Sequence, residues 1–238
     1  MNLISKTLVI FLLFTGIVSA QSSDFYNKAD DFFGKHVSNG LVDYKGICAD
    51  PTELNNLVNM IASAEVAASA NKYQSFYVNA YNILVIKGIT KNYPVKKPTD
   101  VKGFFDTTKY KVAGEQLTLN DIENKKLRAK YPNEPKFHFV LVCAGLGCPP
   151  IIDDAYTPDN VQSLLEKQTK RAINDPKFIK INRDNKEVKI SQIFEWYKED
   201  FLKHGSYVDF LNKFLKDPIS EDYKVSFYNY DWNLNSQN

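Results

Sequence analysis

The sequence has few cysteines and histidines, which limits the metal chemistry open to it. Its 238 residues include three of each, with no Cys-x-x-Cys motif and no closely spaced pair of histidines. Structural zinc sites need four ligands at recognisable spacings. We therefore expect neither a metal site nor a cofactor.

The chain also lacks an excess of charge of either sign. It carries 30 Lys and Arg against 28 Asp and Glu, and no run of basic residues is longer than two. Nucleic-acid-binding proteins usually present a basic patch or stripe. We expect no nucleic-acid partner.

Long apolar runs are absent as well. The run at residues 8–18 is shorter than the roughly 20 residues that span a membrane. It follows Lys6 and precedes the small-residue motif Val18-Ser-Ala20, which is the pattern of a signal peptide. The sequence predicts a signal peptide over residues 1–20, with an uncleaved anchor as the alternative. We expect an exported protein, periplasmic or extracellular, with no stable membrane span after cleavage.

The remaining residues, 21–238, predict a single globular domain, because they contain no internal repeat and no low-complexity linker. Apolar periodicity and turn residues predict helices and strands along this part of the chain. Helices are expected over residues 24–37, 51–63, 73–90, 121–131, 157–173, 194–202 and 207–215, and strands over 107–112, 116–119, 137–143, 178–181, 187–190 and 223–228. The sum is an α+β fold, rich in helices, around a small antiparallel sheet.

The segment His138-Phe-Val-Leu-Val-Cys143-Ala-Gly-Leu-Gly-Cys148 is the most informative part of the sequence. Its first half reads as a buried strand, in which His138 and Cys143 point to opposite faces because they are five residues apart. Cys143 is then a core residue. Cys148 follows a glycine loop that can fold back toward the face of His138.

A thiol at Cys148 would face unpaired backbone N–H groups, which lower a thiol pKa. We expect Cys148 to act as a nucleophile and His138 as its general base, with backbone N–H groups of Gly147 or Cys148 stabilising an oxyanion. A disulfide is the alternative, between Cys143 and Cys148 or between Cys48 and either of them. Three cysteines cannot all pair within one chain, so one thiol is left over.

Three more polar positions are candidates for orienting the base or the substrate. Asn79 and Asn82 share one face of the predicted helix 73–90, and they either point at the site or tie the helix to a neighbouring loop. Glu123 either orients His138 or forms a capping box with Asn120. Tyr81 lies beside the two asparagines as a candidate substrate contact.

Several motifs in order resemble the bacterial "domain of unknown function 547" family. They are Tyr77-Val-Asn79-Ala-Tyr81-Asn82, Leu119-Asn-Asp-Ile-Glu123 with Leu127-Arg128, His138 through Cys143 with Gly147-Cys148-Pro149, Ser191-Gln-Ile-Phe194-Glu-Trp196-Tyr197 with Asp200-Phe201, and Tyr230-Asp231-Trp232 with Leu234-Asn235. The resemblance covers about residues 42–235 and implies a common domain and site, but no settled activity. Asn124 departs from the family pattern, in which a histidine often follows the glutamate.

More loosely, the chain is similar to papain-like and transglutaminase-like thiol enzymes, in which a long helix packs on a small sheet that carries the histidine. Here the helix offers Asn79 where such enzymes have a cysteine. The first functional hypothesis is an exported thiol-dependent hydrolase or acyl-transfer enzyme acting on a peptide-like amide or ester, with catalytic Cys148, His138 and Glu123. The alternative is a non-catalytic binding or interaction module with a structural disulfide. The expected partner is an unidentified peptide-like or small-molecule ligand.

Overall fold

A computed structural model describes residues 23–203 and 205–237. The predicted signal peptide, residues 1–20, lies outside the described residues. The described part begins with a helix over residues 23–36. The elements that follow are β1 (Val37–Ser38), β2 (Leu41–Val42), α2 (Tyr44–Ala49), α3 (Thr52–Ser63), α4 (Ala70–Asn92), the 3₁₀ turn η1 (Pro98–Asp100), β3 (Tyr110–Val112), β4 (Glu115–Leu117), α5 (Leu119–Asp121), the π-helix η2 (Ile122–Arg128), the 3₁₀ helix η3 (Pro135–Phe139), α6 (Val161–Ile173), β5 (Lys180–Asn182), β6 (Glu187–Ser191), α7 (Gln192–Trp196), α8 (Lys198–Phe201), α9 (Tyr207–Asn212) and β7 (Lys224–Tyr228). The α+β class is confirmed.

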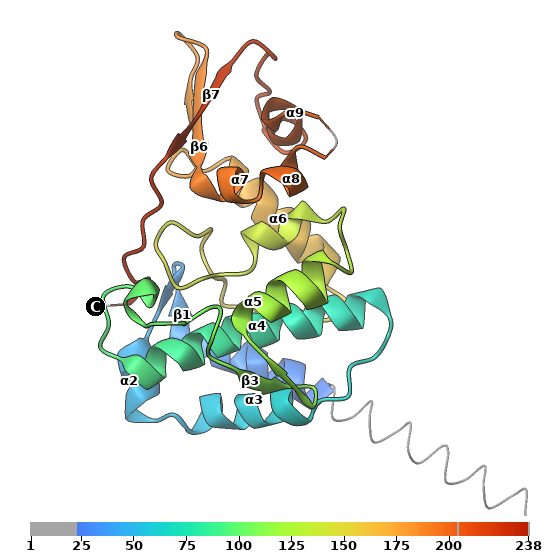
Figure 1. Cartoon of the computed structure of the whole chain (residues 1–238), viewed down its shortest axis with the longest axis vertical. Helices are drawn as coiled ribbons and strands as arrows, with labels where there is room; N and C mark the ends of the chain where they lie inside the picture. Colours follow the sequence, from blue (N-terminus) through green and yellow to red (C-terminus); the bar gives the residue numbers. More distant parts are fainter. Residues whose placement is uncertain (1–22, 204, 238) are drawn as a thin grey trace, which may run out of the picture.

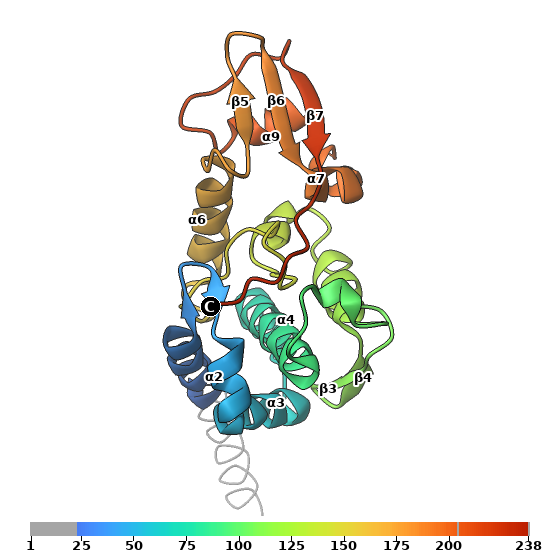
Figure 2. The same cartoon turned by 90° about the vertical axis from the view of Figure 1, so that its left-hand side faces the viewer.

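The helix α4 is the centre of the larger, helical part of the molecule. All its residues from Gln74 to Ile86 are buried, on every side of the helix axis. Such a helix needs neighbours all round, and α2, α3, η2 and α6 supply them (Figure 2). The long helix expected over residues 73–90 is therefore confirmed and extended by a few residues at each end.

The three-stranded sheet β5-β6-β7 lies at the opposite end of the molecule from α2 and α3, with α7, α8 and α9 beside it (Figure 1). The strands β5 and β6 are antiparallel, as expected. However, β7 is parallel to β6, with Val188 opposite Val225. The expectation of a purely antiparallel sheet is wrong here, because α7, α8 and α9 intervene and return the chain along the direction of β6.

A second, two-stranded ribbon is the hairpin of β3 and β4, with Tyr110 opposite Leu117. Its turn residues Ala113 and Gly114 both have positive φ, which gives the twist that a two-residue hairpin needs. The hairpin expected from the sequence is confirmed.

The strand expected at residues 137–143 is wrong. Pro135 starts the 3₁₀ helix η3, and the Glu134 side chain accepts from the Lys136 N–H at 3.3 Å. The apolar residues that follow are buried without any sheet partner, because Asn82 of α4 bonds to their backbone instead. The argument that placed Cys143 on the face opposite His138 therefore does not apply.

The capping box expected at Asn120 and Glu123 is also wrong, by two residues. Thr118 caps α5, and its side chain and that of Asp121 exchange hydrogen bonds with each other's backbone at 3.0 Å. The backbone of Thr118 is extended and the helix begins at Leu119, so the residue three positions after the cap is Asp121 and not Glu123. Glu123 is thereby released from a capping role.

The C-terminal segment after β7 runs back from the sheet to the helical end (Figure 2), where Ser236 pairs with Val42 of β2. Along this path the backbone N–H of Leu234 donates to Lys96 and that of Asn235 donates to Ala144. Val42 and Gln237 also bond through their backbones. The tail thus joins both ends of the molecule. Among the described residues, no helix is long and apolar enough to cross a membrane.

Candidate functional site

A cavity of about 480 Å³ opens between η2, η3, α7 and the C-terminal tail. Its described lining includes four of the residues predicted to form the site, namely Tyr81, Glu123, His138 and Cys148, together with Cys143. The rest of the lining is Thr99, Val101, Gly103, Phe104, Phe105, Asp106, Asn120, Leu141, Ile193, Trp196, Tyr197, Tyr230 and Trp232.

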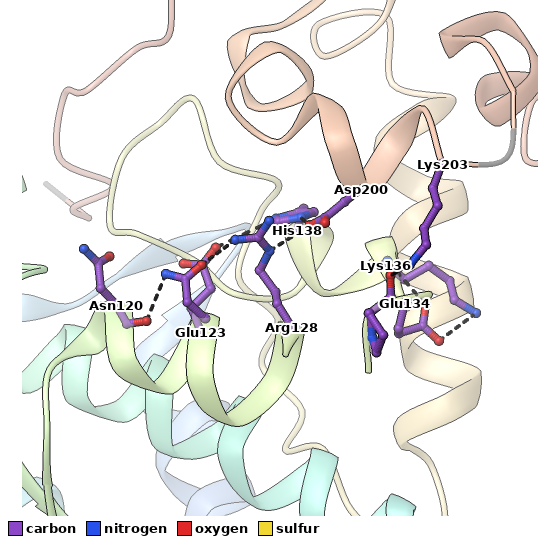
Figure 3. Close-up of polar contacts among 10 residues, drawn as sticks. Asn120, Glu123, Arg128, Glu134, Lys136, His138, Asp200 and Lys203 are labelled. Carbon is purple, nitrogen blue, oxygen red and sulfur yellow. Dashed lines mark hydrogen bonds and ion pairs between the residues drawn. The ribbon is translucent and has the colours of Figure 1, made fainter. Parts of the chain in front are cut away.

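His138 is held between two carboxylates. Its Nε2 lies 2.8 Å from Asp200 Oδ2, and its Nδ1 lies 3.9 Å from Glu123 Oε1. Figure 3 shows both acidic side chains reaching the imidazole from different elements, Glu123 from η2 and Asp200 from α8. His138 and Glu123 are buried, so this arrangement fixes the ring within the wall of the cavity.

Arg128 completes this polar group. Its Nε donates to Asp200 Oδ2 at 2.7 Å, and its Nη1 donates to the side chain of Asn124. Burial alone would raise the pKa of Asp200, but the hydrogen bonds from His138 and Arg128 hold it well below its usual range. Asp200 is thus an anion that orients both the imidazole and the guanidinium.

The π-helix η2 explains how Glu123 and Arg128 reach the same place. In an α-helix, residues five apart point away from each other, since one turn takes 3.6 residues. Bonds from i to i+5 widen the turn, and the N–H of Ala129 donates to Asn124 in this way. Residues 123 and 128 then lie almost one above the other, and both face His138 and Asp200.

Tyr197 contacts both His138 and Arg128. Its ring centroid lies 4.0 Å from that of His138, and the guanidinium carbon of Arg128 lies 4.7 Å from the same centroid. Burial, followed by the nearby charge of Glu123, raises the pKa of the Tyr197 hydroxyl well above its usual value. Tyr197 therefore acts here as a neutral hydrogen-bonding and packing residue.

The two cysteines of the loop meet at the hydroxyl of Tyr230. The Sγ atoms of Cys143 and Cys148 lie 2.7 Å apart, and the Tyr230 hydroxyl is 2.7 Å from the first and 2.8 Å from the second. All three cysteines of the chain are free thiols in this structure. Cys148 also accepts from the backbone N–H of Cys143 at 3.0 Å.

The two thiols differ in acidity and exposure. Burial alone would raise the pKa of Cys143, but hydrogen bonds from Cys148, Tyr230 and the Gly145 backbone lower it below the ordinary value. Burial raises the pKa of Cys148 well above that value, and the charge on Cys143 raises it further. Cys143 is also the more exposed of the two. Of the two thiols, Cys143 is therefore the one that loses its proton more readily.

Two predicted site residues, Asn79 and Asn82, do not line the cavity. The amide of Asn79 bonds to the backbone of Ser75 and, in both directions, to that of Tyr156. The amide of Asn82 donates to Val140 O and accepts from Val142 N, each at 2.9 Å. The structural interpretation is confirmed for both, since they tie α4 to neighbouring loops.

Gly147 also has a structural role. Its N–H donates to Asp231 O at 2.7 Å, and the N–H of Cys148 donates to Gly145 O at 3.1 Å. Both groups are thus already engaged, and the expectation that they stabilise an oxyanion is wrong. A Cβ at position 147 would lie 2.8 Å from the Tyr230 ring, so the glycine allows the tail to pack against the loop.

Within the described part of the chain, no hydrogen bond joins His138 to either sulfur. Sequence reasoning missed three residues at this site, namely Asp200, Arg128 and Tyr230, as well as the position of Cys143. All four residues lie in the motifs that resemble the DUF547 family, so their place in these motifs was the one indication in the sequence that they belong to the site.

Residues 66–173 match a family described as "Protein of unknown function, DUF547". This segment includes the motifs around Asn82, Glu123 and His138, whereas the motifs around Asp200 and Tyr230 lie beyond it. No curated protein and no solved structure matches the chain, so the looser similarity to papain-like enzymes stays a prediction. The resemblance to the DUF547 family is confirmed, and residues 66–173 are the part of this chain that carries it.

Proposed function

We propose that this protein is a thiol-dependent acyl-transfer enzyme or hydrolase that acts on a peptide-like amide or ester. One observation supports it above the others: a single cavity is lined by a hydrogen-bonded pair of thiols and by a histidine fixed by an aspartate. A nucleophile, a base and a group that orients the base are the parts that covalent acyl transfer needs.

In this proposal Cys143 is the nucleophile, in place of Cys148. Cys143 is the more exposed residue of the two, and the Tyr230 hydroxyl and the Cys148 thiol stabilise its thiolate by hydrogen bonding. Cys148 then serves as a donor to the charged sulfur. If Cys148 is the nucleophile, as the sequence predicts, Cys148 should react with an alkylating reagent before Cys143. The order in which the two thiols react therefore distinguishes the two assignments.

The reaction has two stages. The Cys143 thiolate attacks the substrate carbonyl carbon, a C–S bond forms, and the C–N or C–O bond to the leaving group breaks as His138 gives that group a proton. Water or an amine then attacks the thioester, gives its proton to His138, and releases the acyl group together with the regenerated thiolate. Asp200 keeps the imidazole oriented throughout, as the third member of a triad does.

Competitive alkylation tests the proposal, with Cys48 as an internal control. Cys48 is the exposed cysteine, but burial of its sulfur raises its pKa, and its thiol donates to Thr90 O. If thiolate content decides reactivity, limiting iodoacetamide at about pH 6 labels Cys143 before Cys48, since a lowered pKa leaves more thiolate at that pH. If exposure decides it, Cys48 reacts first. Peptide mass spectrometry reads the order.

A second experiment detects the covalent intermediate. After brief exposure to p-nitrophenyl acetate, we expect an acetyl group on Cys143 in the wild-type chain and none in Cys143→Ser, whereas Cys48→Ser behaves as the wild type. A native protein in which Cys143 and Cys148 form a disulfide would refute the proposal. So would labelling of Cys48 alone in both experiments.

A further inference from the structure

The lining of the cavity is unusual in its charge. Asp106 and Glu123 contribute carboxylates, and among the described lining residues none is Lys or Arg. The nearest guanidinium, that of Arg128, is bound to Asp200 and is covered by the Tyr197 ring. The groups around the site thus include three carboxylates, from Asp106, Glu123 and Asp200, against this one guanidinium.

Glu123 shows this excess of negative charge most clearly. Its side chain is only 7% exposed, yet its contacts are the Tyr197 hydroxyl and a 3.9 Å approach to His138. A carboxylate has about four acceptor sites, and burying one without a compensating charge is costly. Glu123 therefore has acceptor capacity left on the side that faces the cavity.

Seven of the other sixteen lining residues are Phe, Tyr or Trp. Trp196, Tyr230 and Trp232 form a contiguous group, with ring centroids 5.1 Å apart for the first two, 4.6 Å for the last two, and 5.9 Å between the two indoles. Phe105 extends the group, 6.2 Å from Trp232. Trp196 is 47% exposed, which is unusual for so large an apolar side chain.

We infer that the substrate of this site carries an ammonium group, primary or quaternary, which binds in the cavity against these rings. Aromatic faces attract cations, indole most strongly, and the carboxylates of Asp106 and Glu123 add a charge of the right sign. An anionic substrate would meet two carboxylates and no free cation. This inference rests on the proposed function, since it names the substrate class of the same cavity.

The tryptophans make the test direct. The chain has two, Trp196 and Trp232, and both line the cavity. Selectively excited tryptophan emission therefore reports on this site alone. We titrate the full chain with choline and, separately, with 3,3-dimethylbutan-1-ol, which has the same shape but no charge. The expected result is a saturable change in tryptophan emission with choline, at a concentration at least about tenfold lower than the alcohol needs.

Variants locate the effect. We expect Asp106→Asn and Trp196→Leu each to weaken choline binding by about threefold or more, whereas Asp184→Asn, an exposed carboxylate in the β5–β6 turn, leaves it unchanged. Trp232 still reports in the Trp196→Leu variant. Equal affinity for choline and the alcohol, no response to either, or a response to acetate in their place would overturn the inference.

The same titration separates the two proposals. Cys143→Ser removes the thiol but keeps the aromatic rings and both carboxylates, so we expect this variant to keep the preference for choline over the alcohol while losing the acetyl adduct. Choline binding without any acetyl adduct would refute the proposed enzyme activity, and the cavity would then be an ammonium-binding site only. Thiol chemistry without a preference for choline over the alcohol would support the thiol-dependent enzyme and refute the inference that its substrate carries an ammonium group.

Discussion

Replacing Asn82 by alanine should destabilise the fold strongly, although the residue lies outside the cavity. Its buried amide makes two hydrogen bonds at 2.9 Å, one to each side of Leu141 on the loop that leads to the cysteines. Alanine would leave the Val140 carbonyl and the Val142 N–H buried without partners. Each orphaned group costs about 1–3 kcal/mol, so we expect a loss of about 2–6 kcal/mol in the free energy of unfolding.

Urea denaturation followed by tryptophan emission measures this loss. Asn92→Ala is the matched control on the same helix, because the Asn92 amide makes one bond, to Gly88 O at 2.8 Å, near the exposed C-terminal end. We expect the control to lose about 1 kcal/mol or less. If Asn82→Ala is no less stable than Asn92→Ala but loses thiol reactivity, Asn82 belongs to the chemistry and its structural assignment is refuted.

Three further predictions concern the site. The pKa of Asp200 is depressed in the folded state, so the stabilising effect of its carboxylate is complete above the unfolded-state pKa near 4 and is lost as the pH falls through the folded-state pKa. In urea titrations, Asp200→Asn should therefore lose less free energy of unfolding than the wild type between about pH 5 and 2. The same pH dependence in both proteins would refute this prediction. Tyr230→Phe removes a hydrogen bond that lowers the pKa of Cys143, so the pH midpoint of Cys143 alkylation should rise. A midpoint that stays or falls would contradict this. Gly147→Ala places a Cβ 2.8 Å from the Tyr230 ring and Asp231 N, so it should cost about 1–3 kcal/mol in unfolding free energy, whereas Gly114→Ala, with nothing within 4 Å, should show only the strain of its positive φ.

Local pattern predicted the elements whose stability is local. The helix α3 begins right after Pro51 and ends at Ser63, as its apolar spacing and its proline indicate. The β3–β4 hairpin follows from its Ala113-Gly114 turn. In these segments the hydrogen bonds join residues close in sequence, so the sequence window contains the physical cause.

The strand expected at residues 137–143 failed because an apolar run does not say what pairs with its backbone. Here Asn82 bonds to Val140 and Val142, 58 and 60 residues away in the chain. Buried backbone needs a partner, but a side chain can supply it as well as a strand can. Nothing within the run itself distinguishes the two cases.

The site was predicted only in part, because several of its contacts also join residues that are distant in sequence. His138, Glu123 and Cys148 were visible as unusual residues in apolar surroundings, and the cavity brings them together. Their partners come from far along the chain: Asp200 lies 62 residues from His138, and Tyr230 lies 87 residues from Cys143. No spacing rule links such positions, and only the fold shows that they meet.

The return of the C-terminal tail has a consequence for how this protein matures. Tyr230, Trp232 and Asn235 are synthesised after all the helices and strands described above, yet Tyr230 bonds to the Cys143 sulfur, Tyr230 and Trp232 line the cavity, and Asn235 accepts from the Tyr44 hydroxyl at 2.8 Å. The helical half can pack earlier, but the reactive loop stays open until these final residues arrive. A nascent chain, or one cut before Tyr230, would therefore expose the thiols of Cys143 and Cys148.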